Sequence, residues 1–116
     1  MVNVLLAEDD VTMLSLLETL LKMEGFQVTT LKPDGDVISA LKKIKPDVLL
    51  MDVHLGERNG LEILELIRED HDMSNTRVVM TSGMSIGDEC LRLGADEFLL
   101  KPYTPDELIH LIIKNS

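Results

Sequence analysis

The chain has 116 residues and a net charge of −10 at neutral pH, with hydrophobic residues at 45% of positions and aromatic residues at only 3%. This length suits one compact domain, and the apolar fraction is too high for a disordered chain. The charge has the wrong sign for direct contact with nucleic acids or anionic membranes, which Lys and Arg side chains bind. We therefore predict a single domain with an aliphatic core.

The chain shows no sign of secretion or membrane insertion. Its single cysteine, Cys90, cannot form an internal disulfide, and we expect it to be a small buried side chain. The N-terminus becomes acidic at Glu8, too early for a signal peptide, and no apolar run approaches the roughly 20 residues of a membrane span. A cytoplasmic location with no membrane contact is predicted.

Short apolar runs alternate with helical patterns along the chain. Residues 4–7 are continuously apolar, which is typical of a buried strand. Asp10 stands where a helix N-cap would, and Gly25 marks the end of that helix. Residues 26–31 predict a second strand, and the turn at 33–35 precedes a short helix.

The second half repeats this alternation. Strands are predicted at residues 47–51, 78–80 and 98–100; the first of them lacks polar alternation and should be covered on both faces. Apolar residues at helical spacing around 61–67 and 90–93 predict the intervening helices. Residues 104–107 open the last helix with a capping box. Five strand–helix units imply an α/β domain, with a doubly wound five-stranded parallel sheet.

Polar side chains follow four of the predicted strands, at the edge where such sheets bind ligands. Glu8 and Asp9 follow the first strand, Asp52 the third, Ser82 the fourth and Lys101 the fifth. Each residue alone would be interpreted as a cap or a solvated side chain. Together, three acids repel one another and require a counter-ion. Magnesium suits carboxylate and water oxygens, and an open coordination side implies a phosphoryl ligand.

The whole chain resembles the receiver domain of response regulators in two-component signalling. Four stretches carry the resemblance, and Ser82 follows Asp52 at the family's spacing; the stretches are residues 4–10, 45–52, 59–62 and 94–103. The resemblance implies the flavodoxin-like (βα)5 fold with strand order 2-1-3-4-5. It also implies one receiver domain over residues 1–116, with no output domain.

The resemblance further implies a metal site. Asp9 would bind Mg2+ directly, with Mn2+ as the alternative ion, and Glu8 would bind it through water. Asp52 and the backbone carbonyl of His54 would complete the protein ligands.

The family's chemistry assigns the remaining roles. Asp52 would accept the phosphoryl group as an acyl phosphate, because it is ionised at neutral pH and needs no base. Ser82 would hydrogen-bond the phosphoryl oxygen, and Lys101 would pair with Asp52 and then with the phosphate. Phe98 takes the switch aromatic position, and Lys101–Pro102 would be a cis peptide.

The expected function is therefore a phosphorylation-activated switch that catalyses only its own phosphorylation and dephosphorylation. The donor would be a histidine kinase or a phosphotransfer protein. A second copy or an output partner would use the face formed by the fourth helix, fifth strand and fifth helix. On the last helix, Ile109 and Ile113 extend the apolar arc beyond the width that one packed face needs. Either these two side chains contact a partner or a neighbouring helix covers them, and the sequence favours neither alternative.

The chain departs from the family pattern at several positions. Gly56 stands where Pro is usual, which predicts a more mobile loop, and Tyr103 replaces Phe. The segment 82–94 is about one helical turn short, so a stunted fourth helix is expected. Residues 68–72 are interpreted as a solvated helix end.

Three other functions fit these residues less well. A flavin-binding module needs a phosphate-cradling loop after the first strand, where this chain has acids. An aspartate-nucleophile phosphatase usually has a second acid two residues after the nucleophile, and that position is His54. A receiver that only docks partners would not need the full set of reactive groups that this chain retains.

Overall fold

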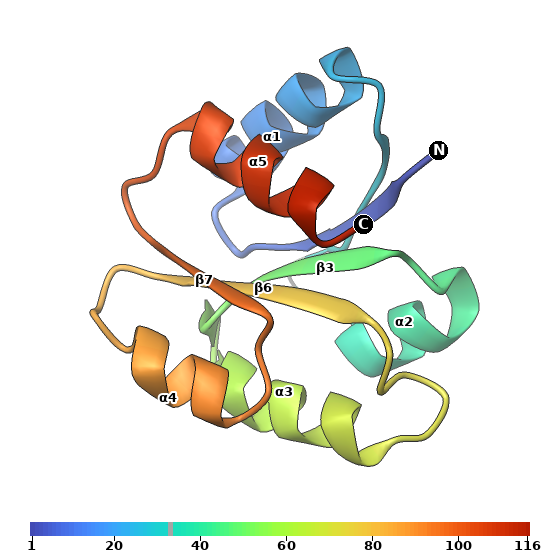
Figure 1. The fold of residues 1–116 in the computed structure, drawn as a ribbon, viewed down its shortest axis with the longest axis vertical. Helices are drawn as coiled ribbons and strands as arrows, with labels where there is room; N and C mark the ends of the chain where they lie inside the picture. The colour runs from blue at the N-terminus through green and yellow to red at the C-terminus, as the bar shows by residue number, and fades with distance from the viewer. Residues whose placement is uncertain (33) are drawn as a thin grey trace.

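A five-stranded parallel sheet forms the centre of the computed structural model, which describes residues 1–32 and 34–116 (Figure 1). Pro33, in the predicted turn, lies outside the described residues. The strands are β1 (Asn3–Ala7), β2 (Gln27–Thr30), β3 (Val48–Asp52), β6 (Arg77–Ser82) and β7 (Glu97–Leu100). Their order is β2-β1-β3-β6-β7, which confirms the predicted 2-1-3-4-5 topology because β4 and β5 form a separate hairpin.

Helices cover both faces of the sheet, as the alternating pattern predicted. Figure 1 shows α1 (Val11–Met23) and α5 (Pro105–Lys114) above the sheet. Below it lie α2 (Val37–Ile44), α3 (Gly60–Glu69) and α4 (Gly87–Arg92). All of β3 is buried because helices lie on either side of it. Its successive residues alternate between the two cores: Leu49 faces the α2–α4 side and Leu50 the α1–α5 side.

The helix ends confirm the capping residues predicted from sequence. The Asp10 side chain accepts hydrogen bonds from the amides of Thr12 and Met13, which would otherwise lack partners at the start of α1. At α5, the Thr104 hydroxyl accepts from the amide of Glu107 at 3.1 Å. Gly25 follows Glu24, the C-cap residue of α1, and has a φ of +92°, a conformation that glycine adopts without strain.

The fourth helix is short, as expected, with six residues.

Two surfaces of the structure differ from the sequence prediction, one on the last helix and one at Arg68. Ile109 is half-buried against the α1–α5 core, whereas Ile113 is 59% exposed, so only the second extends the apolar arc to solvent. Arg68 is not a solvated helix end: its side chain is only 21% exposed and holds an ion pair with Asp96. Among the described residues, no helix is long and apolar enough to cross a membrane.

The segment after β3 forms a small hairpin that the sequence pattern did not predict. It consists of β4 (His54–Leu55) and β5 (Arg58–Asn59), paired antiparallel. Gly56 in its turn has a φ of +61°. The amide of Gly60 then donates to the carbonyl of Val53 at 2.6 Å, so the first turn of α3 lies directly against the end of β3.

The close approach of α3 to the end of β3 leaves no room for a side chain at position 60. A Cβ there would lie 2.6 Å from the Asp52 carbonyl oxygen and 2.9 Å from the Val53 Cα, and both atoms are backbone. We expect Gly60→Ala to lower the free energy of unfolding by about 2 kcal/mol. Urea denaturation measures it, and the control is Gly83→Ala, whose Cβ would meet nothing within 4 Å. Equal stability of the two variants would contradict the close approach.

Candidate functional site

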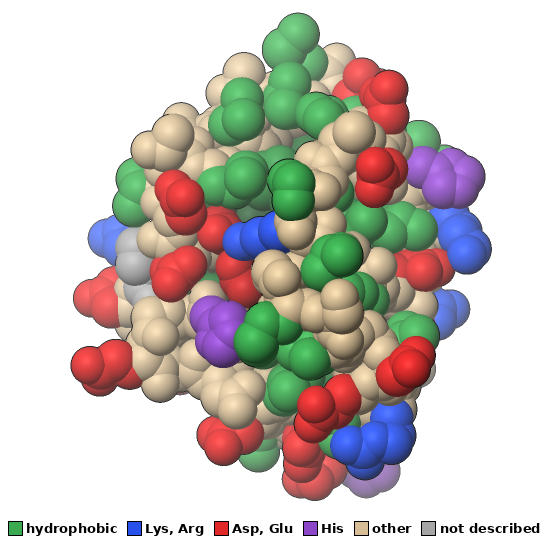
Figure 2. Space-filling model, turned by 90° about the vertical axis from the view of Figure 1, so that its left-hand side faces the viewer, with side chains coloured by type: hydrophobic (Ala, Val, Ile, Leu, Met, Phe, Trp, Pro, Cys, Tyr) green, Lys and Arg blue, Asp and Glu red, His purple; other side chains and the backbone are tan. Residues whose placement is uncertain are grey.

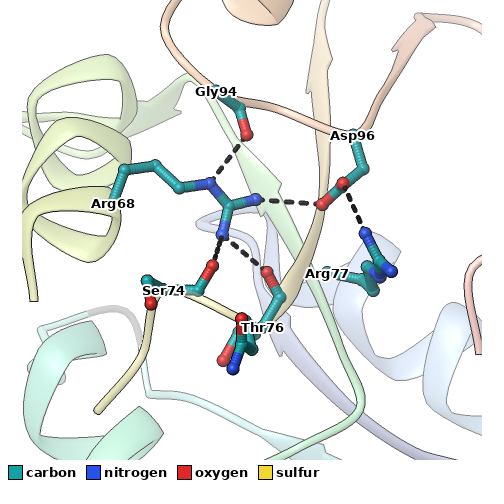
Figure 3. A pocket seen from close by; sticks show the side chains of 7 residues that line it. Arg68, Ser74, Thr76, Arg77, Gly94 and Asp96 are labelled. Atoms are coloured by element: carbon teal, nitrogen blue, oxygen red, sulfur yellow. Dashed lines mark hydrogen bonds and ion pairs between the residues drawn. The ribbon is translucent and has the colours of Figure 1, made fainter. Parts of the chain in front are cut away.

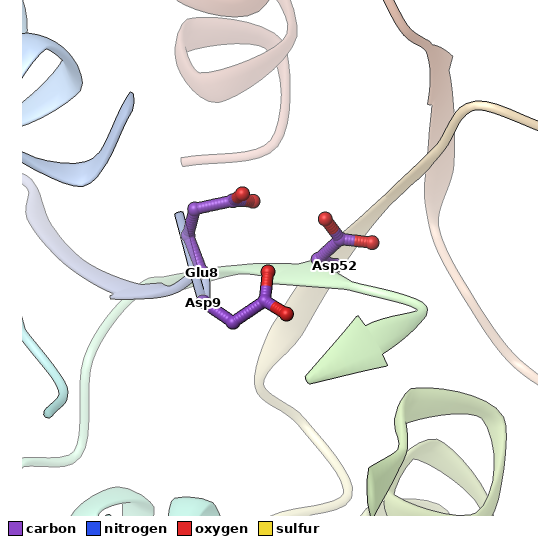
Figure 4. A group of neighbouring side chains, drawn as sticks. All are labelled: Glu8, Asp9 and Asp52. Atoms are coloured by element: carbon purple, nitrogen blue, oxygen red, sulfur yellow. The ribbon is translucent and has the colours of Figure 1, made fainter. Parts of the chain in front are cut away.

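Three carboxylates meet at the carboxyl edge of the sheet. Glu8 and Asp9 follow β1, and Asp52 ends β3; one oxygen from each lies within 4.8 Å of the others (Figure 4). The cause is strand register, because β1 and β3 are parallel neighbours with Ala7 opposite Met51. The residues that follow Ala7 and Met51 must therefore share one edge. Glu8 and Asp52 are each only 6% exposed, whereas Asp9 is exposed.

Lys101, directly after β7, reaches across to this cluster. Its Nζ lies 2.5 Å from Asp52 Oδ2 and 3.1 Å from both carboxylate oxygens of Glu8. The pairing with Asp52 was expected from the resemblance, but the contact with Glu8 was not. The Lys101–Pro102 peptide bond is cis, as predicted. One ammonium thus bridges acids that come from two other strands.

The pKa values of these groups reflect both burial and pairing. Burial raises the pKa of Glu8 to about 6, although the hydrogen bond from Lys101 opposes this. Burial lowers the pKa of the Lys101 ammonium, but hydrogen bonds to Asp52 and Glu8 outweigh it, so its net pKa is raised. The edge therefore groups two buried acids and one exposed acid around a single ammonium.

Ser82 and His54 flank the Asp52 carboxylate. Ser82 is the fully buried last residue of β6, one position beyond Thr81, which pairs with Asp52 in the sheet. Its hydroxyl accepts a hydrogen bond from the amide of Met84 at 3.1 Å, and no hydrogen bond joins it to Asp52 among the described residues. The amide of His54 donates to Asp52 Oδ1 at 3.0 Å, which fixes the orientation of that carboxylate.

Asp9 has a partner that the sequence pattern did not reveal. The amide of Gly56, in the turn of the β4–β5 hairpin, donates to Asp9 Oδ2 at 3.0 Å. These residues are 47 positions apart, and a backbone donor leaves no trace in residue type. Of the candidates, the structure thus brings together Glu8, Asp9, Asp52 and Lys101, and the hairpin contributes Gly56.

The residues present fit a hard divalent cation. All three side-chain donors are carboxylates, the ligand type that magnesium takes, and one or two of them are usually enough. Asp9 is exposed, so water can reach the cluster from that side. Figure 2 looks onto the left-hand side of Figure 1 and shows acidic side chains grouped beside a Lys or Arg side chain near the centre of the face.

A family comparison decides what kind of site this is. A model for the response regulator receiver domain matches residues 4–113. The chain belongs to this family. Receiver domains of two-component response regulators are phosphorylation-dependent signalling switches that interact with histidine kinases or phosphotransfer proteins.

Curated relatives are longer than this receiver domain. The transcriptional regulatory protein CpxR of Klebsiella pneumoniae is 39% identical over 112 residues, which cover 92% of this chain and 46% of CpxR. Protein RcaC of Microchaete diplosiphon is 32% identical over 115 residues, covering 97% of this chain and 18% of RcaC. The chain thus spans less than half the length of these two relatives.

Solved structures share the fold. Chemotaxis protein CheY4 of Vibrio cholerae superposes with a TM-score of 0.87 at 21% identity, covering 100% of this chain and 99% of CheY4. The receiver domain of a sensor histidine kinase from Pseudomonas aeruginosa has a TM-score of 0.81 at 25% identity, with 97% and 95% coverage. That structure has a magnesium ion coordinated in its active site cleft.

A cleft of about 330 Å3 lies at the edge of the sheet opposite the acid cluster, beside the start of β6 (Figure 3). The Arg68 guanidinium donates most of its hydrogen bonds to other groups of the chain. Its acceptors are the carbonyls of Gly94, Ser74 and Thr76 and the carboxylate of Asp96. Asp96 also accepts from Arg77 and from the Val78 amide. This network ties α3 to the starts of β6 and β7, which is a structural role.

Proposed function

We propose that Asp52 accepts a phosphoryl group from the phosphohistidine of a histidine kinase or phosphotransfer protein, in a Mg2+-dependent reaction. One observation carries the proposal: the Asp52 carboxylate contacts the Lys101 ammonium and lies within 4.8 Å of carboxylate oxygens of Glu8 and Asp9. A nucleophile thus has a fixed positive charge beside it and belongs to a group of acids that can bind a cation.

Each residue of the site has its own role in phosphoryl transfer. An Asp52 oxygen forms the new bond to phosphorus as the donor's P–N bond breaks, and the imidazole leaves with that electron pair. Glu8, Asp9, Asp52 and the His54 carbonyl would hold Mg2+, which when bound supplies positive charge for the phosphoryl oxygens. The Lys101 ammonium stabilises the same charge, and the Ser82 hydroxyl supplies a hydrogen bond. Transfer of this kind depends mainly on positioning and charge neutralisation.

Phosphorylation would then reach the surface through Phe98. A Cβ on Gly87, the first residue of α4, would lie 3.0 Å from the Phe98 ring, so the ring packs against the start of that helix. A shift of the Ser82 hydroxyl toward a phosphoryl group would change the β6–α4 segment, and the ring and α4 would have to repack with it. Conformational change at α4 is therefore the proposed output.

The proposed partner surface is the face formed by α4, β7 and α5. Each element presents one exposed apolar side chain there: Leu91, Leu100 and Ile113, between 46% and 59% exposed. A second copy of the chain or an output domain would cover them. The 116 residues carry a net charge of −10, which supports a protein partner for this face in preference to nucleic acid.

Phosphorylation and its metal requirement can be tested together. Incubation with a small phosphodonor and Mg2+, followed by mass mapping, should label Asp52 alone in the parent. Of the two described acids that contact Lys101, Glu8 and Asp52, only Asp52 lies on the strand next to β6, which ends in Ser82. Asp52→Asn should abolish labelling, and Asp9→Ala should weaken Mg2+ binding by more than tenfold. Label persisting in Asp52→Asn, or unchanged Mg2+ affinity in Asp9→Ala, would contradict the assignment.

The lifetime of the acyl phosphate depends on what can orient water beside Asp52. Met84, two residues after Ser82, is 49% exposed and has only a weak sulfur acceptor, so we expect it to shield the phosphoryl group and slow hydrolysis. After donor removal, Met84→Glu should lose its label faster than the parent. No acceleration would refute shielding. Much slower decay in His54→Ala would show that the exposed His54 side chain assists hydrolysis.

A further inference from the structure

The β4–β5 hairpin reaches back over the acid cluster and contacts it through backbone. The contact is the hydrogen bond from the Gly56 amide to Asp9 Oδ2, 3.0 Å long. Asp9 is the exposed member of the cluster, whereas Glu8 and Asp52 are buried and paired with Lys101. The hairpin therefore orients the one carboxylate that the sheet itself does not hold.

The backbone conformation at position 56 is what aims this amide. Gly56 has a φ of +61°, and a Cβ there would meet nothing within 4 Å, so the constraint is conformational and not steric. Proline cannot reach a positive φ and has no amide hydrogen, so it would remove the contact. Asparagine tolerates the left-handed region and keeps the donor.

The hairpin is itself held at several points. The Arg58 side chain donates to the carbonyl of Gly35, which joins β5 to the segment before α2. The His54 amide donates to Asp52, and the Gly60 amide closes the loop onto Val53. The Gly56 amide thus projects from an anchored frame, and its contact with Asp9 restricts the rotamers of an otherwise solvent-exposed side chain.

We propose that Gly56 is a positioning residue for the divalent-cation site, acting through its amide on Asp9. This inference rests on the proposed function of the acid cluster. A donor on one carboxylate oxygen leaves the remaining lone pairs for the cation and removes rotamers that binding would otherwise have to restrict. By linkage, cation binding at Asp9 strengthens the hold on the hairpin.

The test compares two substitutions at one position. Because the chain has no Trp, Mg2+ affinity is measured by calorimetric titration of metal-free protein. Gly56→Pro should weaken Mg2+ binding about tenfold, as loss of an orienting contact does at other metal sites, and Gly56→Asn should retain the parent affinity. Thermal unfolding of both variants shows whether the fold survives.

The outcomes separate this inference from the function on which it rests. If Gly56→Pro binds Mg2+ as tightly as Gly56→Asn while Asp9→Ala does not bind it, the cation site stands and the positioning role is wrong. If the parent itself binds no Mg2+, both fail. A tenfold loss in Gly56→Pro with rescue in Gly56→Asn supports the inference.

A second measurement does not depend on the proline variant folding. Amide hydrogen exchange of Gly56, followed by NMR in metal-free protein, should be faster in Asp9→Ala than in the parent because the acceptor is gone. The Gly25 amide, which donates to the Lys22 carbonyl far from the site, is the internal reference and should not change. Equal exchange of Gly56 in the two proteins would overturn the contact.

Discussion

The contact of the Lys101 ammonium with both Glu8 and Asp52 is the interaction on which this site depends. Carboxylate oxygens of Glu8 and Asp52 lie within 4.8 Å of each other. Two unit negative charges at about that distance repel each other by roughly 3 to 4 kcal/mol at an effective dielectric constant near 20. The sheet register keeps these carboxylates close together, because Glu8 follows β1 and Asp52 ends β3 at the same edge of the sheet. An ammonium from β7 offsets part of this repulsion and joins three strands of the sheet at their carboxyl ends.

The same charge balance links structure to chemistry. One ammonium cannot neutralise Glu8, Asp9 and Asp52, so the edge remains a site for a further cation, which would in turn attract a phosphoryl group. The surrounding segments serve to keep these groups in place. Gly60 lets α3 start directly behind β3, the His54 amide orients Asp52, and the hairpin amide of Gly56 reaches Asp9.

Much of the framework was predictable because it follows from periodic patterns. The buried run in β3, the cap at Asp10 and the capping box at Thr104 each have a residue-level cause that acts locally. The cluster of Glu8, Asp9 and Asp52 was predictable because parallel strands share an edge, and the cis bond at Lys101–Pro102 because the resemblance implied it.

What sequence could not show depends on backbone donors and on long side chains. The Gly56–Asp9 contact uses an amide that every residue except proline carries, so no residue type marks it. Arg68 seemed solvated because it sits among charged neighbours, yet it donates to the backbone carbonyls of Ser74, Thr76 and Gly94, and no residue type marks a backbone acceptor. The reach of Lys101 to Glu8 depends on a rotamer, which spacing along the chain does not encode.

A double-mutant cycle in metal-free protein measures whether Lys101 offsets the repulsion of the acid cluster. Lys101→Met should lower the free energy of unfolding by about 2 kcal/mol, since it leaves buried carboxylates without their cation. Adding Asp52→Asn to that variant should recover most of the loss, because one of the repelling charges is removed. If the double variant instead shows only the sum of the two single effects, the ammonium does not hold this site together.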